Sequence, residues 1–162
     1  MDVDPSLFGT DLRLLDDLEH QNSRRPGSDL HTVERPERGY PGEPPPRDLR
    51  TVAGVENLRQ ALLLRFLTPL GDLAPLGHPR YGSRLFELVG ELNNETSRNR
   101  AKMYVLQALG EEPRVQEVLG VTVGVHPAIR EQMEIRVTLV ALREAAVLNL
   151  VFPFSLAAGE SP

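Results

Sequence analysis

The spacing of apolar side chains changes at Pro113, and this change limits the folds that the chain can adopt. Before Pro113 the apolar residues recur three or four positions apart, as on one face of a helix. After Pro113 they alternate with polar or small residues, as on one face of a strand. Helices that come first and strands that follow predict an α+β fold. We expect two to three helices packed on a small antiparallel C-terminal sheet.

The longest predicted helix covers residues 55–67. It ends at Thr68-Pro69, because proline lacks the N–H that a helix interior needs. Apolar residues at helical spacing would face the core, and the other face would be polar. That polar face is expected to hold Glu56, Asn57, Arg59, Gln60 and Arg65.

Two further helices are expected before the strands. A short one over residues 84–90 would begin after an N-cap at Ser83, whose hydroxyl can accept a backbone hydrogen bond. The other would be capped by Thr96 or Ser97 and would end at Leu109, just before a glycine.

The alternating block predicts three strands. Residues 115–125 and 133–141 are expected to form an antiparallel hairpin. Gly120 and Gly124 are candidate positions for β-bulges. The third strand is expected over residues 146–152 and would be ended by the proline that follows.

The N-terminal part has a different composition. Residues 19–47 contain six prolines and three glycines and few large apolar side chains, which predicts an irregular, proline-rich arm. Residues 12–18 carry four leucines, whose spacing fits either a short strand or a helical turn. We therefore divide the chain into an N-terminal extension (1–48), an α+β domain (49–156) and a loose tail (157–162).

Composition excludes several classes of protein. The net charge of −5 argues against a general nucleic-acid binder, which needs a basic face. The absence of cysteine excludes disulfides, thiolate metal sites and cysteine nucleophiles, and fits a reducing cytoplasm. No apolar run is long enough to cross a bilayer. We expect neither a nucleic acid nor a membrane as partner.

No residue pattern points to catalysis. The histidines at 20, 31, 78 and 126 lack the spacing of metal ligands. Ser83, His78 and Asp72 could be combined into a triad, but the Gly-x-Ser-x-Gly turn of many serine hydrolases is missing. The adjacent acidic residues at 16–17 and 111–112 are typical of solvated positions. We expect no enzymatic activity, no metal and no cofactor.

Three short motifs occur in order in the α+β domain. The first is Leu-Thr-Pro-Leu-Gly-Asp at 67–72, which ends the longest helix in a tight turn. The second is Gly-His-Pro-Arg-Tyr-Gly-Ser-Arg-Leu at 77–85. The third is Glu112-Pro113-Arg114, between the last helix and the first strand. The Arg114 guanidinium can bind a carboxylate or carbonyl groups in a bidentate way.

This order of motifs resembles the small baseplate wedge family, the sheath initiators. Its relatives occur in contractile phage tails, type VI secretion baseplates and extracellular contractile injection systems. The family pattern is Leu-x-Thr-x-x-Gly-Glu/Asp, Pro-x-Phe/Tyr-Gly-Ser-x-Leu and Glu-Pro-Arg, and the resemblance covers residues 49–152. The acid here is Asp72, and Leu73 stands where the family often has arginine. The long arm favours an injection-system relative.

The resemblance implies roles for the motif residues. Glu112, Pro113 and Arg114 would face the helical core bundle of the wedge, whereas a pairing of Arg114 with Asp72 would be internal; both interpretations stay open. The motif residues expected to have structural roles, such as helix stop, tight turn, aromatic anchor and N-cap, are Thr68, Gly71, Asp72, Pro79, Tyr81, Gly82 and Ser83.

The resemblance also implies a mechanism and partners. The sheet would accept strands from the first sheath ring and so start sheath polymerisation. Partners would be the sheath protein, large wedge proteins and, as a further expectation, tube or hub proteins. Several copies would sit in each ring of a phage tail-like particle assembled in the cytoplasm. The residues expected to pair with sheath strands are Val147, Leu148, Asn149, Leu150, Val151 and Phe152.

Two other functions remain open. A hydrolase of cell-wall glycans would fit the association of tails with wall-degrading activities, although no carboxylate pair supports it. A regulatory adaptor of the same fold would bind one soluble partner and form no ring.

Overall fold

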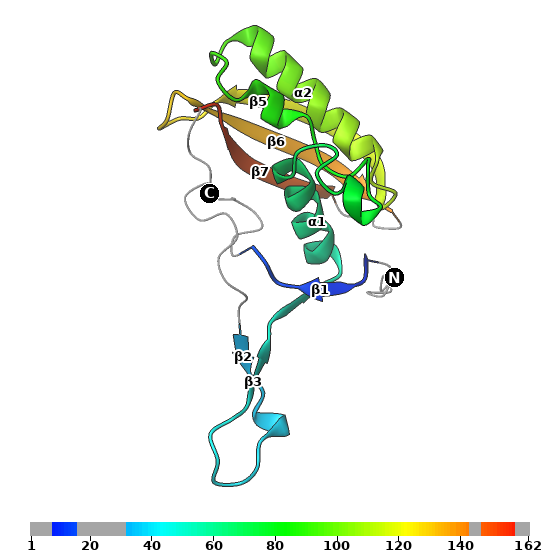
Figure 1. The fold of residues 1–162 in the computed structure, drawn as a ribbon, viewed down its shortest axis with the longest axis vertical. Coiled ribbons are helices and arrows are strands. Elements are labelled where there is room, and N and C mark those ends of the chain that lie inside the picture. Colours follow the sequence, from blue (N-terminus) through cyan, green and yellow to red (C-terminus); the bar gives the residue numbers. More distant parts are fainter. Residues whose placement is uncertain (1–7, 16–31, 143–146, 158–162) are drawn as a thin grey trace.

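The computed structural model describes residues 8–15, 32–142 and 147–157 (Figure 1). Within these ranges it contains two α-helices and antiparallel sheets, which confirms the predicted α+β class. Neither of these helices is long and apolar enough to cross a membrane. The elements in chain order are β1 (Thr10–Leu12), β2 (Thr32–Glu34), β3 (Arg47–Leu49), β4 (Thr51–Ala53), α1 (Val55–Leu67), α2 (Glu95–Gly110), β5 (Val115–Val125), β6 (Gln132–Ala141) and β7 (Val147–Ser155), with short 3-10 turns at Pro36–Arg38, Ala74–Leu76 and Leu85–Leu88.

The C-terminal sheet has the order β5-β6-β7 and is antiparallel throughout. Both helices cover one face of it, with α2 along β5 and α1 against β7 (Figure 1). The rings of Phe66 on α1 and Phe152 on β7 are stacked with centroids 5.0 Å apart. Alternate residues of β6 and β7 are buried under the helices, as the twofold period predicts.

The predicted bulge at Gly120 is confirmed. The register of β5 against β6 shifts between Val118 and Gly120, and again between Val115 and Glu117. Because of the shifts Val118 packs against the core, while Leu119 is 50% exposed. The pairing continues without a shift past Gly124, where a bulge was also expected.

The end of the third strand was predicted incorrectly. β7 passes through Pro153 and continues to Ser155. The Leu156 N–H donates to the Glu131 carbonyl (2.9 Å). In an antiparallel strand the backbone groups of alternate residues face the same neighbour, so those of the even-numbered residues of β7 face β6. Pro153 is odd-numbered, and its missing N–H faces away from β6. A proline can therefore stand in this edge strand without losing a bond to its neighbour.

Two helix boundaries also differ from the prediction. Asn94 caps α2, because its side-chain oxygen accepts a hydrogen bond from the Ser97 N–H (2.9 Å), and the helix includes Gly110. The short helix is a 3-10 turn over Leu85–Leu88. The Ser83 hydroxyl accepts a hydrogen bond from the Leu85 N–H at the start of this turn (3.4 Å), as predicted for an N-cap, and it also donates to the Phe66 carbonyl at the end of α1 (2.9 Å).

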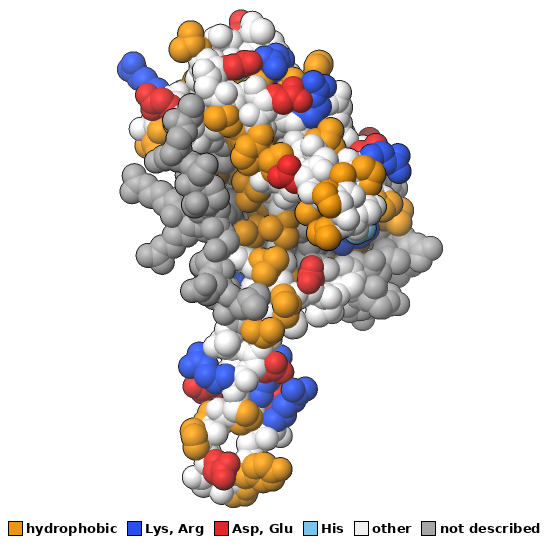
Figure 2. Space-filling view, viewed as in Figure 1, with side chains coloured by type: hydrophobic (Ala, Val, Ile, Leu, Met, Phe, Trp, Pro, Cys, Tyr) orange, Lys and Arg blue, Asp and Glu red, His pale blue; other side chains and the backbone are white. Residues whose placement is uncertain are grey.

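The predicted irregular arm contains ordered pairing in its described part. β2 pairs with β3, and this hairpin projects from the body of the molecule (Figure 1). Figure 2 shows charged side chains of both signs along the hairpin and hydrophobic ones at its end. Most of the hairpin is exposed, which explains why apolar spacing gave no signal for it.

The segment before the arm is part of the core. β1 pairs with β4, so backbone hydrogen bonds join residues on both sides of the expected boundary between positions 48 and 49. Phe8 and Leu15 are buried with the residues of the main core. Of the two alternatives for the leucine-rich stretch, the structure has a strand at residues 10–12, and Leu18 lies outside the described residues.

Candidate functional site

The first two motifs lie side by side in the structure. The Leu70 N–H donates to the Ser83 carbonyl (2.8 Å), and the Ser83 N–H donates to the Thr68 carbonyl (2.8 Å). A longer bond joins the Gly71 N–H to the Tyr81 carbonyl (3.3 Å). The Thr68 hydroxyl ends α1 by donating to the Leu64 carbonyl (2.7 Å). The turn after α1 and the segment before the 3-10 turn therefore form one paired unit.

Gly82 is the tightest point of this unit. Its φ of +108° lies in the region that side chains disfavour. A Cβ atom there would stand 2.6 Å from the Pro69 carbonyl oxygen and 2.7 Å from that of Thr68. Only glycine allows the two segments to approach this closely.

The third motif joins the same corner through a buried carboxylate. Glu112 accepts hydrogen bonds from Arg114 Nε (2.6 Å) and Nη2 (3.2 Å), and from Arg65 Nη2 of α1 (3.4 Å). The Arg65 guanidinium lies over the Tyr81 ring, 4.7 Å from its centroid. One carboxylate thus connects α1, the second motif and the start of β5.

Two neighbouring arginines stabilise the charged form of the Glu112 carboxyl group at this corner. Burial would raise the pKa of Glu112, but the hydrogen bonds and positive charge of Arg114, together with the charge of Arg65, hold that pKa below its usual 4.5. Burial raises the pKa of Tyr81 above its usual 10.0. The two shifts therefore move the pKa values of Glu112 and Tyr81 away from neutral pH and not toward it.

Arg114 pairs with its own motif and not with Asp72. Asp72 is exposed, and the partner of Arg114 is Glu112, two residues earlier. The Arg114 side chain remains 27% exposed, and its Nη1 lies 3.5 Å from the Phe8 carbonyl oxygen. Each guanidinium nitrogen thus lies within hydrogen-bond distance of Glu112 or Phe8, while part of the side chain stays exposed beside the buried pair.

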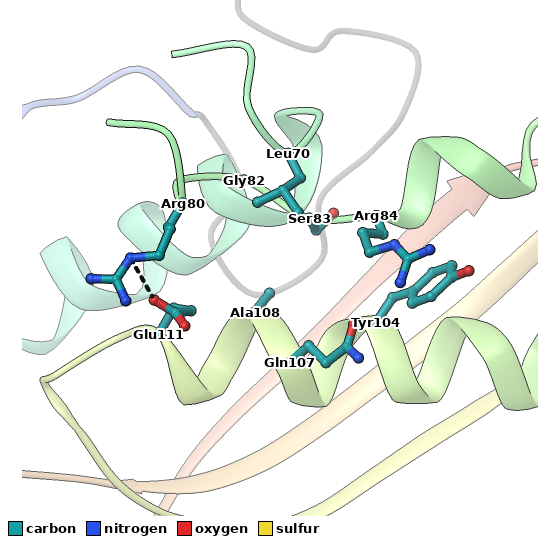
Figure 3. A pocket seen from close by; sticks show the side chains of 9 residues that line it. All are labelled: Leu70, Arg80, Gly82, Ser83, Arg84, Tyr104, Gln107, Ala108 and Glu111. Atoms are coloured by element: carbon teal, nitrogen blue, oxygen red, sulfur yellow. Dashed lines mark ion pairs between the residues drawn. The ribbon is translucent and has the colours of Figure 1, made fainter. Parts of the chain in front are cut away.

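A pocket of about 270 Å³ lies next to this corner (Figure 3). One side comes from α2, with Tyr104, Gln107 and Ala108, and the other from the second motif and Leu70. Among the described residues Glu111 is the only carboxylate that lines it, and Arg80 pairs with it at 3.7 Å. Most glycosidases use two facing carboxyl groups, one of which keeps its proton. The pocket offers one, and the neighbouring Glu112 has a lowered pKa.

The expected strand-pairing residues split into two sets. Leu148, Leu150 and Phe152 point into the core and cannot supply specificity to an added strand. Val147, Asn149 and Val151 are the outward set. Within the part of the chain that the structure describes, β7 is hydrogen-bonded on one side only, to β6. The free groups on its other side belong to these odd-numbered residues.

Apolar spacing placed three functional side chains on the wrong face of α1. Asn57, Gln60 and Arg65 were expected on the polar outer face but are buried. At about 100° a residue, Gln60 and Arg65 lie about 140° apart around the helix, so no single stripe in the sequence marks these positions. Arg65 binds Glu112, while Asn57 and Gln60 bind the N-terminal segment.

Metal ligation has no support in residues 8–15, 32–142 and 147–157. No group of three or more His, Asp or Glu side chains is placed there to hold an ion. His78 and His126 lie in separate turns, and the other two histidines lie outside the described residues.

Comparison with known proteins shows a similarity in fold to a solved structure. No protein-family model matches the chain, and no curated protein matches it. The crystal structure of a "putative tail lysozyme" from Geobacter sulfurreducens matches with a TM-score of 0.56. The two sequences are 24% identical, and the match covers 65% of this chain and 93% of the other. The chain therefore shares the fold of that protein.

Proposed function

We propose that the chain is a structural component of the baseplate of a contractile tail-like particle, and that it is not an enzyme. The observation that carries the proposal is the meeting of the three motifs at one corner. Arg65 of α1 pairs with Glu112 of the third motif and lies over the Tyr81 ring of the second, and the second motif is hydrogen-bonded to the first. Residues far apart in the sequence serve one junction there, which fits the resemblance to the sheath-initiator family. The word "tail" in the description of the Geobacter sulfurreducens chain agrees with this proposal.

The corner and the β7 edge would have separate tasks. The exposed part of Arg114 would contact the large wedge proteins, with Glu112 fixing its orientation. The free edge of β7 would accept a strand from the first ring of sheath subunits, because unpaired backbone groups supply hydrogen bonds in a fixed register. Tube or hub proteins would contact the projecting hairpin.

Val151→Pro tests the role of the edge in particles from the native host. Proline removes an outward N–H while leaving the backbone bonds to β6 in place. We expect electron microscopy to show tubes and baseplates without sheath. Val151→Thr is the matched control, since it keeps the N–H and the branched shape, and its particles should carry sheath. Normal sheath on Val151→Pro particles would overturn the edge mechanism.

The identity of the partners tests the wider proposal. Affinity purification of the tagged chain from its host should recover sheath, tube and large wedge proteins together. Recovery of one soluble partner in a one-to-one complex would instead favour an adaptor.

A glycan hydrolase is the second candidate, because the Geobacter sulfurreducens chain is described as a lysozyme. The described carboxylates do not favour it, since Glu111 and Glu112 are both paired with arginine. Release of soluble fragments from purified cell walls would support a hydrolase, with Glu111→Gln as the informative variant. We expect no release.

A further inference from the structure

The N-terminal segment at residues 8–15 is held by side chains that bind its backbone. Asn57 Nδ2 donates to the Phe8 carbonyl (2.8 Å). Gln60 uses both ends of its amide: its Nε2 donates to the Leu12 carbonyl (2.7 Å), and its Oε1 accepts from the N–H groups of Leu14 (2.8 Å) and Leu15 (3.3 Å). Both amides are buried on α1. A buried glutamine that makes three hydrogen bonds to the backbone of one extended segment can bind that segment whatever its side chains are.

Strand pairing and two apolar side chains complete the contact. β1 pairs with β4 in the register Thr10 to Ala53, and the Arg13 N–H donates to the Arg50 carbonyl (2.8 Å). Phe8 and Leu15, near the two ends of the segment, are each only 2% exposed. Every one of these contacts is made by residues 8–15 themselves. The same segment from another copy of the chain would make the same contacts.

The connection to the rest of the chain is long enough to permit this exchange. Sixteen residues, 16–31, join the segment to β2. Such a connection can span up to about 55 Å when extended. Since the contacts are the same within one chain and between two chains, the balance depends on the effective concentration of the segment, which for tethered binding partners is typically on the order of 1 mM. Copies held in one ring would reach such concentrations.

We propose that the surface formed by α1 and β4, with Asn57 and Gln60 as its polar contacts, accepts residues 8–15 of a second copy of this chain. The segment would then link neighbouring copies by exchange of an identical element. The exchange rests on the proposed function only for the presence of several copies in one assembly. The contact itself can be tested with the purified protein.

Disulfide trapping can test the exchange, because the chain has no cysteine of its own. Thr10 and Ala53 are partners in a pair whose flanking residues carry the hydrogen bonds, which brings their Cβ atoms close enough for a disulfide. A full-length chain with Thr10→Cys is mixed with a full-length chain with Ala53→Cys, at a concentration on the order of 1 mM. The mixture is oxidised and the mixed dimers are counted by intact mass.

We expect mixed Thr10→Cys and Ala53→Cys dimers to exceed those of a control pair at least about fivefold. The control combines Ala53→Cys with Leu92→Cys, because Leu92 is exposed and unpaired with β4. Adding Gln60→Ala to the Ala53→Cys chain removes three hydrogen bonds to its own segment and to the segment of the other copy alike. The mixed dimers should therefore form several-fold faster and reach the same final yield. Circular dichroism must show that this variant is folded, and Asn57→Ala provides a second test of the same surface.

The double variant Thr10→Cys, Ala53→Cys shows whether residues 10 and 53 lie close enough for a disulfide within one chain. It should close a disulfide within one chain in dilute solution. Closure there, with mixed dimers no more abundant than in the control pair, would overturn the exchange and leave the segment as a contact within one chain. Failure of the double variant to close would also overturn it, since both reactions need the β1–β4 register. Neither result depends on sheath or baseplate proteins, so the proposed function is tested separately.

Discussion

At the scale of single residues, Gly82 shows how a close approach of two backbones shapes the corner. The neighbouring carbonyls leave no room for a Cβ atom, and the positive φ adds strain for any other residue. The sequence placed Gly82 in a motif but gave no information about which segment it would meet. The contact with residues 68 and 69 depends on the tertiary fold.

We expect Gly82→Ala to lower the free energy of unfolding by at least about 3 kcal/mol, from steric displacement and backbone strain together. Gly77→Ala is the matched control, since Gly77 also has a positive φ of +87° but a Cβ atom there would meet nothing within 4 Å. It should cost only about 1 kcal/mol. Urea unfolding measures both, and equal losses would contradict the steric argument.

Glu112→Gln should destabilise the protein by about 3 kcal/mol at neutral pH, because it leaves two arginines beside a neutral amide in a buried site. The lowered pKa of Glu112 makes its charge stabilising above 4.5, and that contribution is lost as the pH falls through the folded-state pKa. The difference between wild type and variant should therefore be constant above about pH 6 and shrink below pH 4.5. A difference that does not change with pH would argue against the ion pairs.

At the scale of elements, apolar spacing predicted α1, β5 and β6 well because burial sets their pattern. It failed where backbone or polar contacts decide the boundary. Pro153 lies inside β7 because the strand is at an edge, and the Asn94 side chain caps α2 one turn earlier than predicted. The burial of Gln60 and Arg65 could not be read from one sequence, since both occupy positions that a solvated helix face would also fill.

Gln60→Ala should loosen residues 8–15 without unfolding the sheet. It removes three hydrogen bonds to that segment, a loss of about 2–3 kcal/mol in the free energy of local opening. Hydrogen exchange at the amides of Leu14 and Leu15 should become at least tenfold faster. The exchange rates of the β6 amides should change only as far as the global stability of the protein changes. Gln107→Ala, on the exposed face of α2, is the control and should leave both rates unchanged.

At the scale of the whole molecule, the core and the projecting hairpin are energetically separate. The buried apolar residues that the structure describes all belong to the body and to the segment 8–15, and none lies between residues 32 and 49. Composition correctly marked this part as unable to form a core, but it could not reveal the short β2–β3 pairing. Three cross-strand pairs with little burial leave no clear periodic signal.

Replacing residues 36–46 by Asn-Gly-Thr should leave the stability of the body unchanged within about 0.5 kcal/mol. The replaced residues are exposed or half-buried, and the threonine N–H can close the Asn-Gly turn on the Arg35 carbonyl, which Pro46 could not do. Thermal unfolding measures the effect. A loss of more than about 2 kcal/mol would mean that the hairpin supports the core.

Pro153 has a further consequence for any chain that pairs with β7. The backbone nitrogen of Pro153 faces away from β6 and carries a ring carbon in place of a hydrogen, so it cannot donate a hydrogen bond to an added strand. Backbone bonds from an added strand can therefore run along Val147, Asn149 and Val151 but lose a donor at the next outward position. Pro153 therefore limits how far an added strand can pair along β7 and the register in which it can pair.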